Sequence, residues 1–288
     1  MQFNGVVLLS SILNYGMRNA GFDHMYQVYL PSYAATAWCH NRLANKPADL
    51  EAFLAEVRAY ANGPYVAALA KGTDISPAEA DAVAAKLSQY TGLSPQFIKD
   101  VDLRIDLGRF RKELERDQRR TVGRLDSRFE GIDVDAGGET PEYDASDSYI
   151  TGAFIGTFHD YLATELGYTT NLTYRPSYDE INKNWDWKHK APGSSRPMPV
   201  ADTALDLAAA MRENPRLKVY SLNGYYDMAT PFFGTEYDIA HMQLDPALRR
   251  NVSFAYYPSG HMVYLHEDSL KRMKADLDRF YDEAAAGR

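Results

Sequence analysis

The chain contains little cysteine, no long apolar run and no excess of positive charge, and each absence excludes a class of protein. Its 288 residues include one cysteine, Cys39, so no disulfide can form within the chain. No stretch of about 18 consecutive apolar residues occurs, so a transmembrane helix is not expected. The net charge of -8 argues against nucleic acid as the main partner, because binding to phosphates requires a basic surface. It also gives no support to binding of an anionic membrane surface.

The patterns of a metal site and of a signal peptide are also missing. The 7 histidines do not gather at the spacings of a zinc site, so neither a metal ion nor another cofactor is expected. The N-terminus lacks the basic segment, apolar stretch and small-residue cleavage site of a signal peptide. Residues 5–10 instead form a short apolar, β-branched run, which predicts a strand buried on both faces in a parallel sheet. Because the chain enters this strand almost at once, we expect that further residues of the same protein lie upstream of Met1.

The middle of the chain has the composition of a helical insertion. Residues 47–128 are rich in Ala, Glu, Lys and Arg and carry apolar side chains at helical spacing. Ser76 and Ser94 each precede a proline, the pattern of an N-cap followed by proline at the first helical position. A helix is also expected earlier, over residues 32–40, after a loop that starts near residue 26.

The most charged part of the insertion, residues 104–128, predicts one long helix. Arg111 and Glu115 stand four residues apart, a spacing at which opposite charges stabilise a helix. Because acids are interspersed among the bases, we expect this helix to present a solvated face, with a basic binding surface as the alternative. A further helix is expected over residues 148–166, followed by an irregular loop over residues 176–199.

A regular alternation of helices and strands begins near residue 200. Apolar patterns predict the order helix, strand, helix, strand, helix, over residues 202–212, 217–222, 238–242, 251–257 and 269–285. This order is the signature of right-handed parallel crossovers in an α/β protein. We therefore assign residues 1–41 and 200–288 to a parallel-sheet core and residues 42–199 to a mainly helical insertion.

Two polar residues follow consecutive strands of this core. Asp227 lies in the loop after the strand at residues 217–222, and His261 lies in the loop after the strand at residues 251–257. In open parallel sheets, functional groups gather at the carboxyl ends of strands. Either residue alone is usually a loop cap or a turn former, but their occurrence together favours a catalytic role. An acid followed by a histidine is also the chain order of the α/β-hydrolases.

The pair meets a defined chemical requirement. A serine hydroxyl is a weak nucleophile at neutral pH, so an imidazole must accept its proton. The imidazole in turn needs a carboxylate that fixes its tautomer and stabilises the imidazolium. We therefore predict that Asp227 and His261 are the acid and base of a serine-hydrolase triad, with Gly224 and Gly260 shaping their turns.

These segments resemble the C-terminal part of the serine carboxypeptidase family. The residues that match the family's patterns are Gly224, Asp227, Gly234, Thr235, Gly260, His261, Met262, Val263 and the helix from Ser269. Residues 4–11 resemble the strand that follows the nucleophile helix in that family, and the helical insertion resembles its cap. Tyr264 stands where the family often has proline, a change that we expect to affect packing rather than mechanism.

The resemblance implies an incomplete α/β-hydrolase-like parallel sheet with a large, mainly helical cap over residues 42–199. It implies an enzyme that removes C-terminal residues from peptides, with Asp227 and His261 as catalytic residues and no cofactor. It also implies that Met228 and Met262, which neighbour them in sequence, contact the peptide substrate. A full-length parent of this family is expected in the periplasm or outside the cell.

The nucleophile of such an enzyme is missing from the sequence. A nucleophile elbow has the pattern Gly-x-Ser-x-Gly between a strand and a helix, and no such segment occurs. Ser10 and Ser11 follow a strand but lack the glycines, so we interpret them as loop caps. In the resembled family, the elbow and the oxyanion-hole donors lie upstream of the strand that residues 5–10 match. We therefore expect the chain alone to be inactive.

Two other interpretations stay open. An esterase, acyltransferase or lyase would use the same triad on the same scaffold, and substrate profiling of the full-length parent separates these activities. A non-catalytic binding protein derived from the fold is favoured if the reading frame truly begins at Met1.

Overall fold

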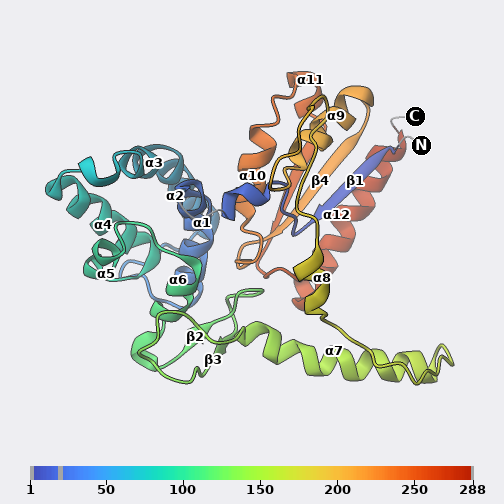
Figure 1. The fold of residues 1–288 in the computed structure, drawn as a ribbon, viewed down its shortest axis with the longest axis horizontal. Coiled ribbons are helices and arrows are strands. Elements are labelled where there is room, and N and C mark those ends of the chain that lie inside the picture. The colour runs from blue at the N-terminus through green and yellow to red at the C-terminus, as the bar shows by residue number, and fades with distance from the viewer. Residues whose placement is uncertain (1–2, 19–21, 287–288) are drawn as a thin grey trace.

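The computed structural model describes residues 3–18 and 22–286, and its centre is a small parallel β-sheet (Figure 1). The strands are β1 (Gly5–Leu9), β4 (Lys218–Gly224) and β5 (Val252–Tyr257), in the spatial order β1-β4-β5. Both pairings are parallel, with Leu222 of the central strand opposite Leu9 on one side and Ala255 on the other. All three predicted strands are therefore confirmed, as is the α/β class of the fold.

Strand β1 is less buried than the sequence predicted. Residues 6–8 are half-buried and Leu9 is 37% exposed, whereas β4 is buried from Val219 onward. The reason is its position, because β1 lies at the edge of the sheet and pairs on one side only among the described residues. Its outer backbone groups are therefore open to a further strand.

Helices cover both faces of this sheet. They are α9 (Ala204–Glu213), α10 (Phe232–Ala240), the short α11 (Pro246–Arg249) and α12 (Glu267–Ala286). Met211 of α9 shares an apolar cluster with Val219, whereas Phe280 of α12 stacks on Tyr220 in a second cluster. Consecutive residues of a strand point to opposite faces, so α9 and α12 lie on opposite sides of the sheet. The predicted order of helices and strands is confirmed, and α10 is longer than the sequence predicted.

The insertion between the sheet segments is mainly helical. Its helices are α2 (Leu50–Tyr60), a π-helical segment (Ala61–Tyr65), α3 (Val66–Leu69), α4 (Pro77–Thr91), α5 (Pro95–Asp100) and α6 (Leu107–Glu113). Short 3-10 turns occur in the insertion at Gly72–Asp74 and Arg116–Gln118. Two others lie outside it, at Tyr15–Arg18 and Val263–Leu265. The predicted N-caps are confirmed, because Ser76 Oγ accepts the N–H of Glu79 and Ser94 Oγ accepts the N–H of Phe97.

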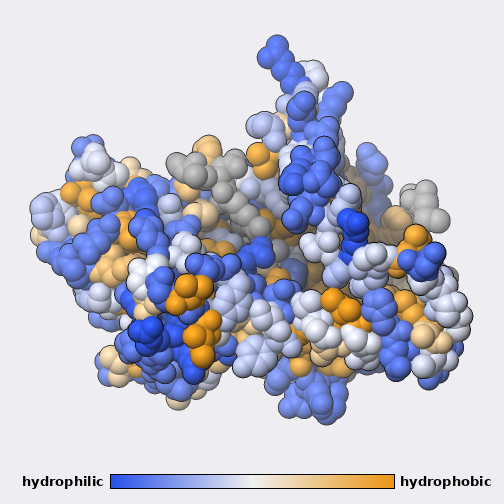
Figure 2. Space-filling model, turned by 60° about the horizontal axis from the view of Figure 1, so that its bottom comes forward, coloured by the Kyte–Doolittle hydropathy of each residue, from blue (hydrophilic) through white to orange (hydrophobic). Residues whose placement is uncertain are grey.

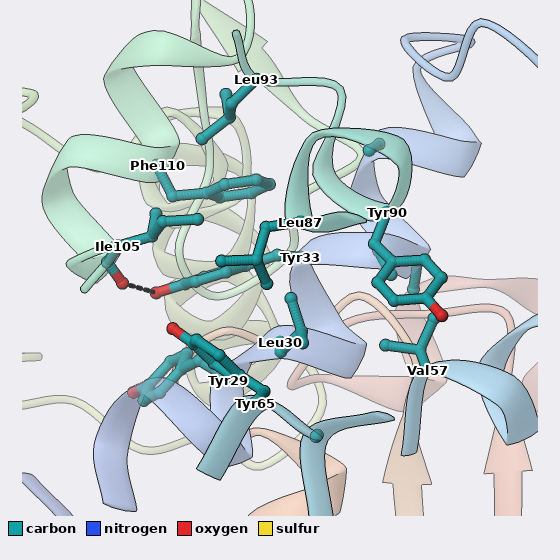
Figure 3. Close-up of a cluster of buried hydrophobic side chains, with 14 of the residues drawn as sticks. Tyr29, Leu30, Tyr33, Val57, Tyr65, Leu87, Tyr90, Leu93, Ile105 and Phe110 are labelled. Carbon is teal, nitrogen blue, oxygen red and sulfur yellow. Dashed lines mark hydrogen bonds between the residues drawn. The ribbon is translucent and has the colours of Figure 1, made fainter. Parts of the chain in front are cut away.

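Helix α1 (His24–Cys39) begins earlier than the sequence predicted. The prediction of a loop from about residue 26 to residue 31 is wrong, because the helix runs through Pro31 without interruption. Residues 27–37 are buried, so packing on all sides outweighs the helix-breaking tendency of proline. Tyr33 of α1 stacks on Phe110 with ring centroids 4.0 Å apart (Figure 3). Helix α1, which we assigned to the sheet core, thus shares the hydrophobic core of the insertion.

The charged segment 104–128 is not one long helix, which corrects the prediction. Helix α6 is followed by a two-stranded antiparallel sheet of β2 (Thr121–Val122) and β3 (Glu130–Gly131). The prediction of a solvated face is also wrong. Lys112 is 3% exposed, and its Nζ lies 2.7 Å from Oδ2 of Asp133. Internal partners satisfy these buried charges, and a pattern of charges along the sequence cannot show that.

Helix α7 (Ala145–Thr164) confirms the helix predicted near residues 148–166 and extends away from the helical core (Figure 1). The short α8 (Asp179–Asn184) interrupts the irregular segment that follows. Helix α7 and the segment that follows it expose several large apolar side chains, namely Tyr149, Phe154, Phe158, Tyr161, Leu166, Leu172 and Trp185. Figure 2 shows apolar residues among polar ones across the underside of the molecule. Within the described ranges, no helix is both long and apolar enough to span a membrane.

Candidate active site

The carboxyl ends of β4 and β5 lie side by side and carry the two predicted residues. Gly224, the last residue of β4, is in register with Tyr257, the last residue of β5. The loops beyond them touch closely, because a Cβ on Gly224 would come within 2.3 Å of the carbonyl oxygen of Gly260. Glycine is needed for this approach of one backbone to the other. The two loops are therefore close enough for a direct contact between their side chains.

Asp227 and His261 make that contact. Nδ1 of His261 lies 2.9 Å from Oδ2 of Asp227, whose side chain is 1% exposed. A carboxylate only accepts hydrogen bonds, so Nδ1 donates and carries the proton of the neutral imidazole. Nε2 then holds the lone pair that can take up a proton. No hydrogen bond to Nε2 occurs within the described part of the chain, and the side chain of His261 is 32% exposed.

Backbone and hydroxyl groups fix the carboxylate of Asp227. Its Oδ1 accepts the N–H of Ala229 at 2.7 Å and the N–H of Thr230 at 2.8 Å. The hydroxyl of Thr230 lies 2.7 Å from Oδ2 and 3.2 Å from Nδ1 of His261. These contacts stabilise a buried charge and set the plane in which the carboxylate meets the imidazole. Thr230 was not among the residues predicted from the sequence, and its position three residues after the aspartate is the signal that could have identified it.

Ser10 contacts the backbone of the histidine and not its ring. It follows β1 with a φ of 47°, and its Oγ donates to the carbonyl oxygen of His261 at 2.6 Å. The carbonyl oxygen of Ser10 lies 3.0 Å from the hydroxyl of Thr230. The neighbouring Ser11 directs its Oγ to the carbonyl of Leu9 at 3.5 Å. Both hydroxyls thus bind backbone carbonyls, as expected for residues that cap a loop.

An apolar cavity of about 350 Å³ adjoins the histidine loop. Its apolar lining includes Leu125, Met262 and the α7 residues Ile150, Phe154, Ile155 and Phe158. Met228, the other methionine predicted to contact substrate, is fully buried in the hydrophobic core and exposes no surface to a ligand. Of the two methionines, Met262 is therefore the one that borders a cavity.

Two tyrosines in the aspartate loop stay protonated near neutral pH. Burial raises the pKa of Tyr225 to about 12, and the carboxylate of Glu51, 3.2 Å from its hydroxyl, contributes to the rise. Burial also raises the pKa of Tyr226. Neither phenol can act as a base at neutral pH.

No group of three or more His, Cys, Asp or Glu side chains is arranged to hold a metal ion in residues 3–18 and 22–286. Comparisons of the chain with protein-family models, with curated proteins and with solved structures found no match.

Proposed function

We propose that this chain supplies the aspartate and the histidine of a serine-type carboxypeptidase, an enzyme that removes C-terminal residues from peptides. The observation that carries the proposal is the hydrogen bond between Asp227 and His261 at the carboxyl edge of a parallel sheet. In this proposal, the serine nucleophile comes from a segment that is not among the 288 residues. The resemblance of the two loops to those of serine carboxypeptidases supports the choice of reaction.

In the proposed reaction, Nε2 of His261 accepts the serine proton while the serine oxygen attacks the carbonyl carbon of the peptide bond. The imidazolium then donates this proton to the amine nitrogen as the C–N bond breaks. Nε2 next takes a proton from the water that attacks the acyl-enzyme, and it returns that proton to the departing serine oxygen. The carboxylate of Asp227, 2.9 Å from Nδ1, stabilises each imidazolium.

The edge of β1 that has no partner strand among the described residues supports the proposed location of the nucleophile. A further parallel strand on this edge would end beside Ser10, on the same side of the sheet as the ends of β4 and β5. A strand-to-helix elbow after such a strand would present its serine at the edge that carries His261. This is the arrangement that proton transfer to Nε2 requires.

The cavity beside Met262 supports a peptide with an apolar side chain as the substrate. Leu125, Phe154 and Phe158 present apolar surface to it. Burial of one aliphatic or aromatic side chain contributes about 1.5–3 kcal/mol to binding. That energy would hold a peptide residue next to the proposed base.

The proposal is tested by measuring whether the protein encoded by the complete reading frame hydrolyses blocked dipeptides. The DNA upstream of the Met1 codon is sequenced for an in-frame Gly-x-Ser-x-Gly segment, and the whole protein is then expressed. We expect it to release the C-terminal residue from an N-blocked dipeptide and to cleave the corresponding dipeptide amide far more slowly. Asp227→Asn and His261→Ala are expected to lower kcat on the order of 10⁴-fold. His266→Ala, on the same loop, is the matched control and is expected to retain activity.

The same preparation separates the competing functions. Rapid cleavage of simple esters without release of residues from dipeptides would favour an esterase, and peptide binding without any cleavage would favour a binding protein. An upstream sequence without an elbow, or full activity in both triad variants, would contradict the proposal. The 288-residue chain alone is expected to hydrolyse none of these substrates. Hydrolysis by that chain that His261→Ala abolishes would show that the nucleophile lies within it.

A further inference from the structure

A short segment of the helical insertion, residues 124–128, binds both loops of the candidate site, and we call it the bracket. On the aspartate side, the N–H of Met228 donates to the carbonyl of Arg124 at 3.1 Å. The N–H of Ser127 donates in the opposite direction, to the carbonyl of Tyr226 at 3.0 Å. These two bonds hold the backbone on either side of Asp227.

On the histidine side, the bracket binds the turn that presents the imidazole. The N–H of His261 donates to the carbonyl of Leu125 at 2.6 Å, and the N–H of Gly260 donates to Oδ2 of Asp126 at 3.1 Å. A Cβ on Gly260 would lie 2.4 Å from Cβ of Asp126. The glycine before the histidine is therefore required by the close approach of Asp126, because any larger residue would push the turn away.

Asp126 and Arg128 form an ion pair that reaches along the rest of this turn. Asp126 is completely buried, and its carboxylate accepts Nε of Arg128 at 2.9 Å and Nη2 at 2.6 Å. The same guanidinium donates from Nη1 to the carbonyl of Pro258 at 3.0 Å and from Nη2 to Oγ of Ser259 at 3.2 Å. The pair thus contacts each of the three residues before His261. A planar guanidinium fork with a carboxylate partner fixes such a geometry more tightly than a single bond does.

Residues at the start of α7 and just after α1 hold the bracket in place. Oγ of Ser146, at the start of α7, accepts the N–H of Leu125 at 3.1 Å and the N–H of Asp126 at 3.2 Å. Nε2 of His40, just after α1, lies 2.6 Å from the carbonyl oxygen of Ser127. The position of the histidine turn is therefore linked to helices that lie outside the sheet core.

We propose that Asp126 is a positioning residue for His261, acting through Gly260 and Arg128 to keep the imidazole aligned with Asp227. As a contribution to catalysis, this role rests on the function proposed above. A residue that only stabilised the fold would leave the hydrogen bond between His261 and Asp227 unchanged in the molecules that remain folded. The proposal requires that this bond weakens when Asp126 changes.

Proton NMR of the 288-residue chain tests the geometry without any activity. The Nδ1 proton of His261, bound to a buried carboxylate, is expected to give a downfield resonance that is absent in His261→Gln. In Asp126→Asn, we expect this proton to exchange with water at least about tenfold faster, because the imidazole is no longer held in line. The matched control is Asp133→Asn, which removes another buried carboxylate with one cationic partner, whose hydrogen bonds go to Lys112, Val134 and Glu142 and not to the histidine turn.

An unchanged exchange rate of this proton in Asp126→Asn, or an equal increase in Asp133→Asn, would overturn the proposal. If Asp126→Asn does not fold, Arg128→Lys provides the same test, because lysine keeps the charge opposite Asp126 but cannot reach Pro258 and Ser259 together. In the complete enzyme, Asp126→Asn is expected to lower kcat about 10–100-fold with little change in KM. A wild-type enzyme that cleaves no dipeptide would refute the proposed function, whereas the NMR result would still decide the role of Asp126.

Discussion

Replacing Asp238 with asparagine is expected to stabilise the protein at alkaline pH and to leave its stability near pH 4 almost unchanged. Asp238 lies on α10, is 5% exposed, and accepts the backbone N–H of Asn14 at 3.1 Å. Burial raises the pKa of its carboxyl from 3.8 to about 7, and the nearby Asp202 contributes to the rise. Both causes disfavour the charged form in the folded state.

The sign and the size of the effect follow from this pKa. Between pH 3.8 and about 7 the folded state holds a proton that the unfolded state has lost, so unfolding releases a proton. Stability therefore falls as the pH rises through this window, and the full penalty is present above it. The interval from 3.8 to about 7, at about 1.4 kcal/mol per pH unit, corresponds to a penalty of ~4 kcal/mol. Below pH 3.8 both states are protonated and the penalty vanishes.

Urea denaturation of the two proteins at pH 4 and at pH 8 measures the effect. Asparagine keeps an acceptor oxygen for the N–H of Asn14 but carries no charge, so Asp238→Asn avoids the penalty. The variant is expected to exceed the wild type by ~2–4 kcal/mol at pH 8 and to match it within about 0.5 kcal/mol at pH 4. Asp282→Asn, on the exposed face of α12, is the control and is expected to show no pH-dependent difference. An equal difference at both pH values, or a less stable variant at pH 8, would refute the reasoning.

Three other substitutions test separate contacts. Gly260→Ala is expected to cost about 1–3 kcal/mol in thermal unfolding, because its Cβ would lie 2.4 Å from that of Asp126; an unchanged melting temperature would contradict the close approach. Lys112→Met is expected to cost about 3–5 kcal/mol in urea denaturation by leaving Asp133 buried without its cation, and adding Asp133→Asn is expected to recover part of the loss. In the proposed carboxypeptidase, Phe154→Asp is expected to raise KM for peptides with apolar C-terminal residues and to leave kcat unchanged; an unchanged KM would exclude the cavity from substrate binding.

The strands and the two loops of the candidate site could be predicted because their signals are local. The apolar run of β4 is short and rich in residues that favour strands, and the strand ends at Gly224. The run of β5 is similar, and Gly260 lies three residues beyond its last residue, Tyr257. Parallel pairing of β4 and β5 then brings the two strand ends together, and this pairing places Asp227 and His261 in contact.

The remaining parts depend on contacts between distant residues, which no local pattern records. Helix α1 passes through Pro31 because it is surrounded by other helices, and a proline viewed alone predicts a break. Lys112 is buried because Asp133 meets it from a later loop. Asp126 resembles the other acids of a charged segment, and only the fold shows that it binds Gly260, which lies 134 residues away.

The bracket also changes what a helical insertion can do in such a protein. An insertion that only covers a pocket determines which substrates bind, so substitutions in it alter KM. Here the insertion also supplies the carbonyl of Leu125 and the carboxylate of Asp126 to the turn that carries His261. In the proposed enzyme, proton transfer depends on the orientation of the imidazole, so a displacement of this turn by a fraction of an ångström is expected to lower kcat. Variants in the bracket, residues 124–128, are expected to lower kcat of the proposed enzyme. Variants of the α7 residues that line the cavity are expected to raise KM, so the two sets would separate the two roles.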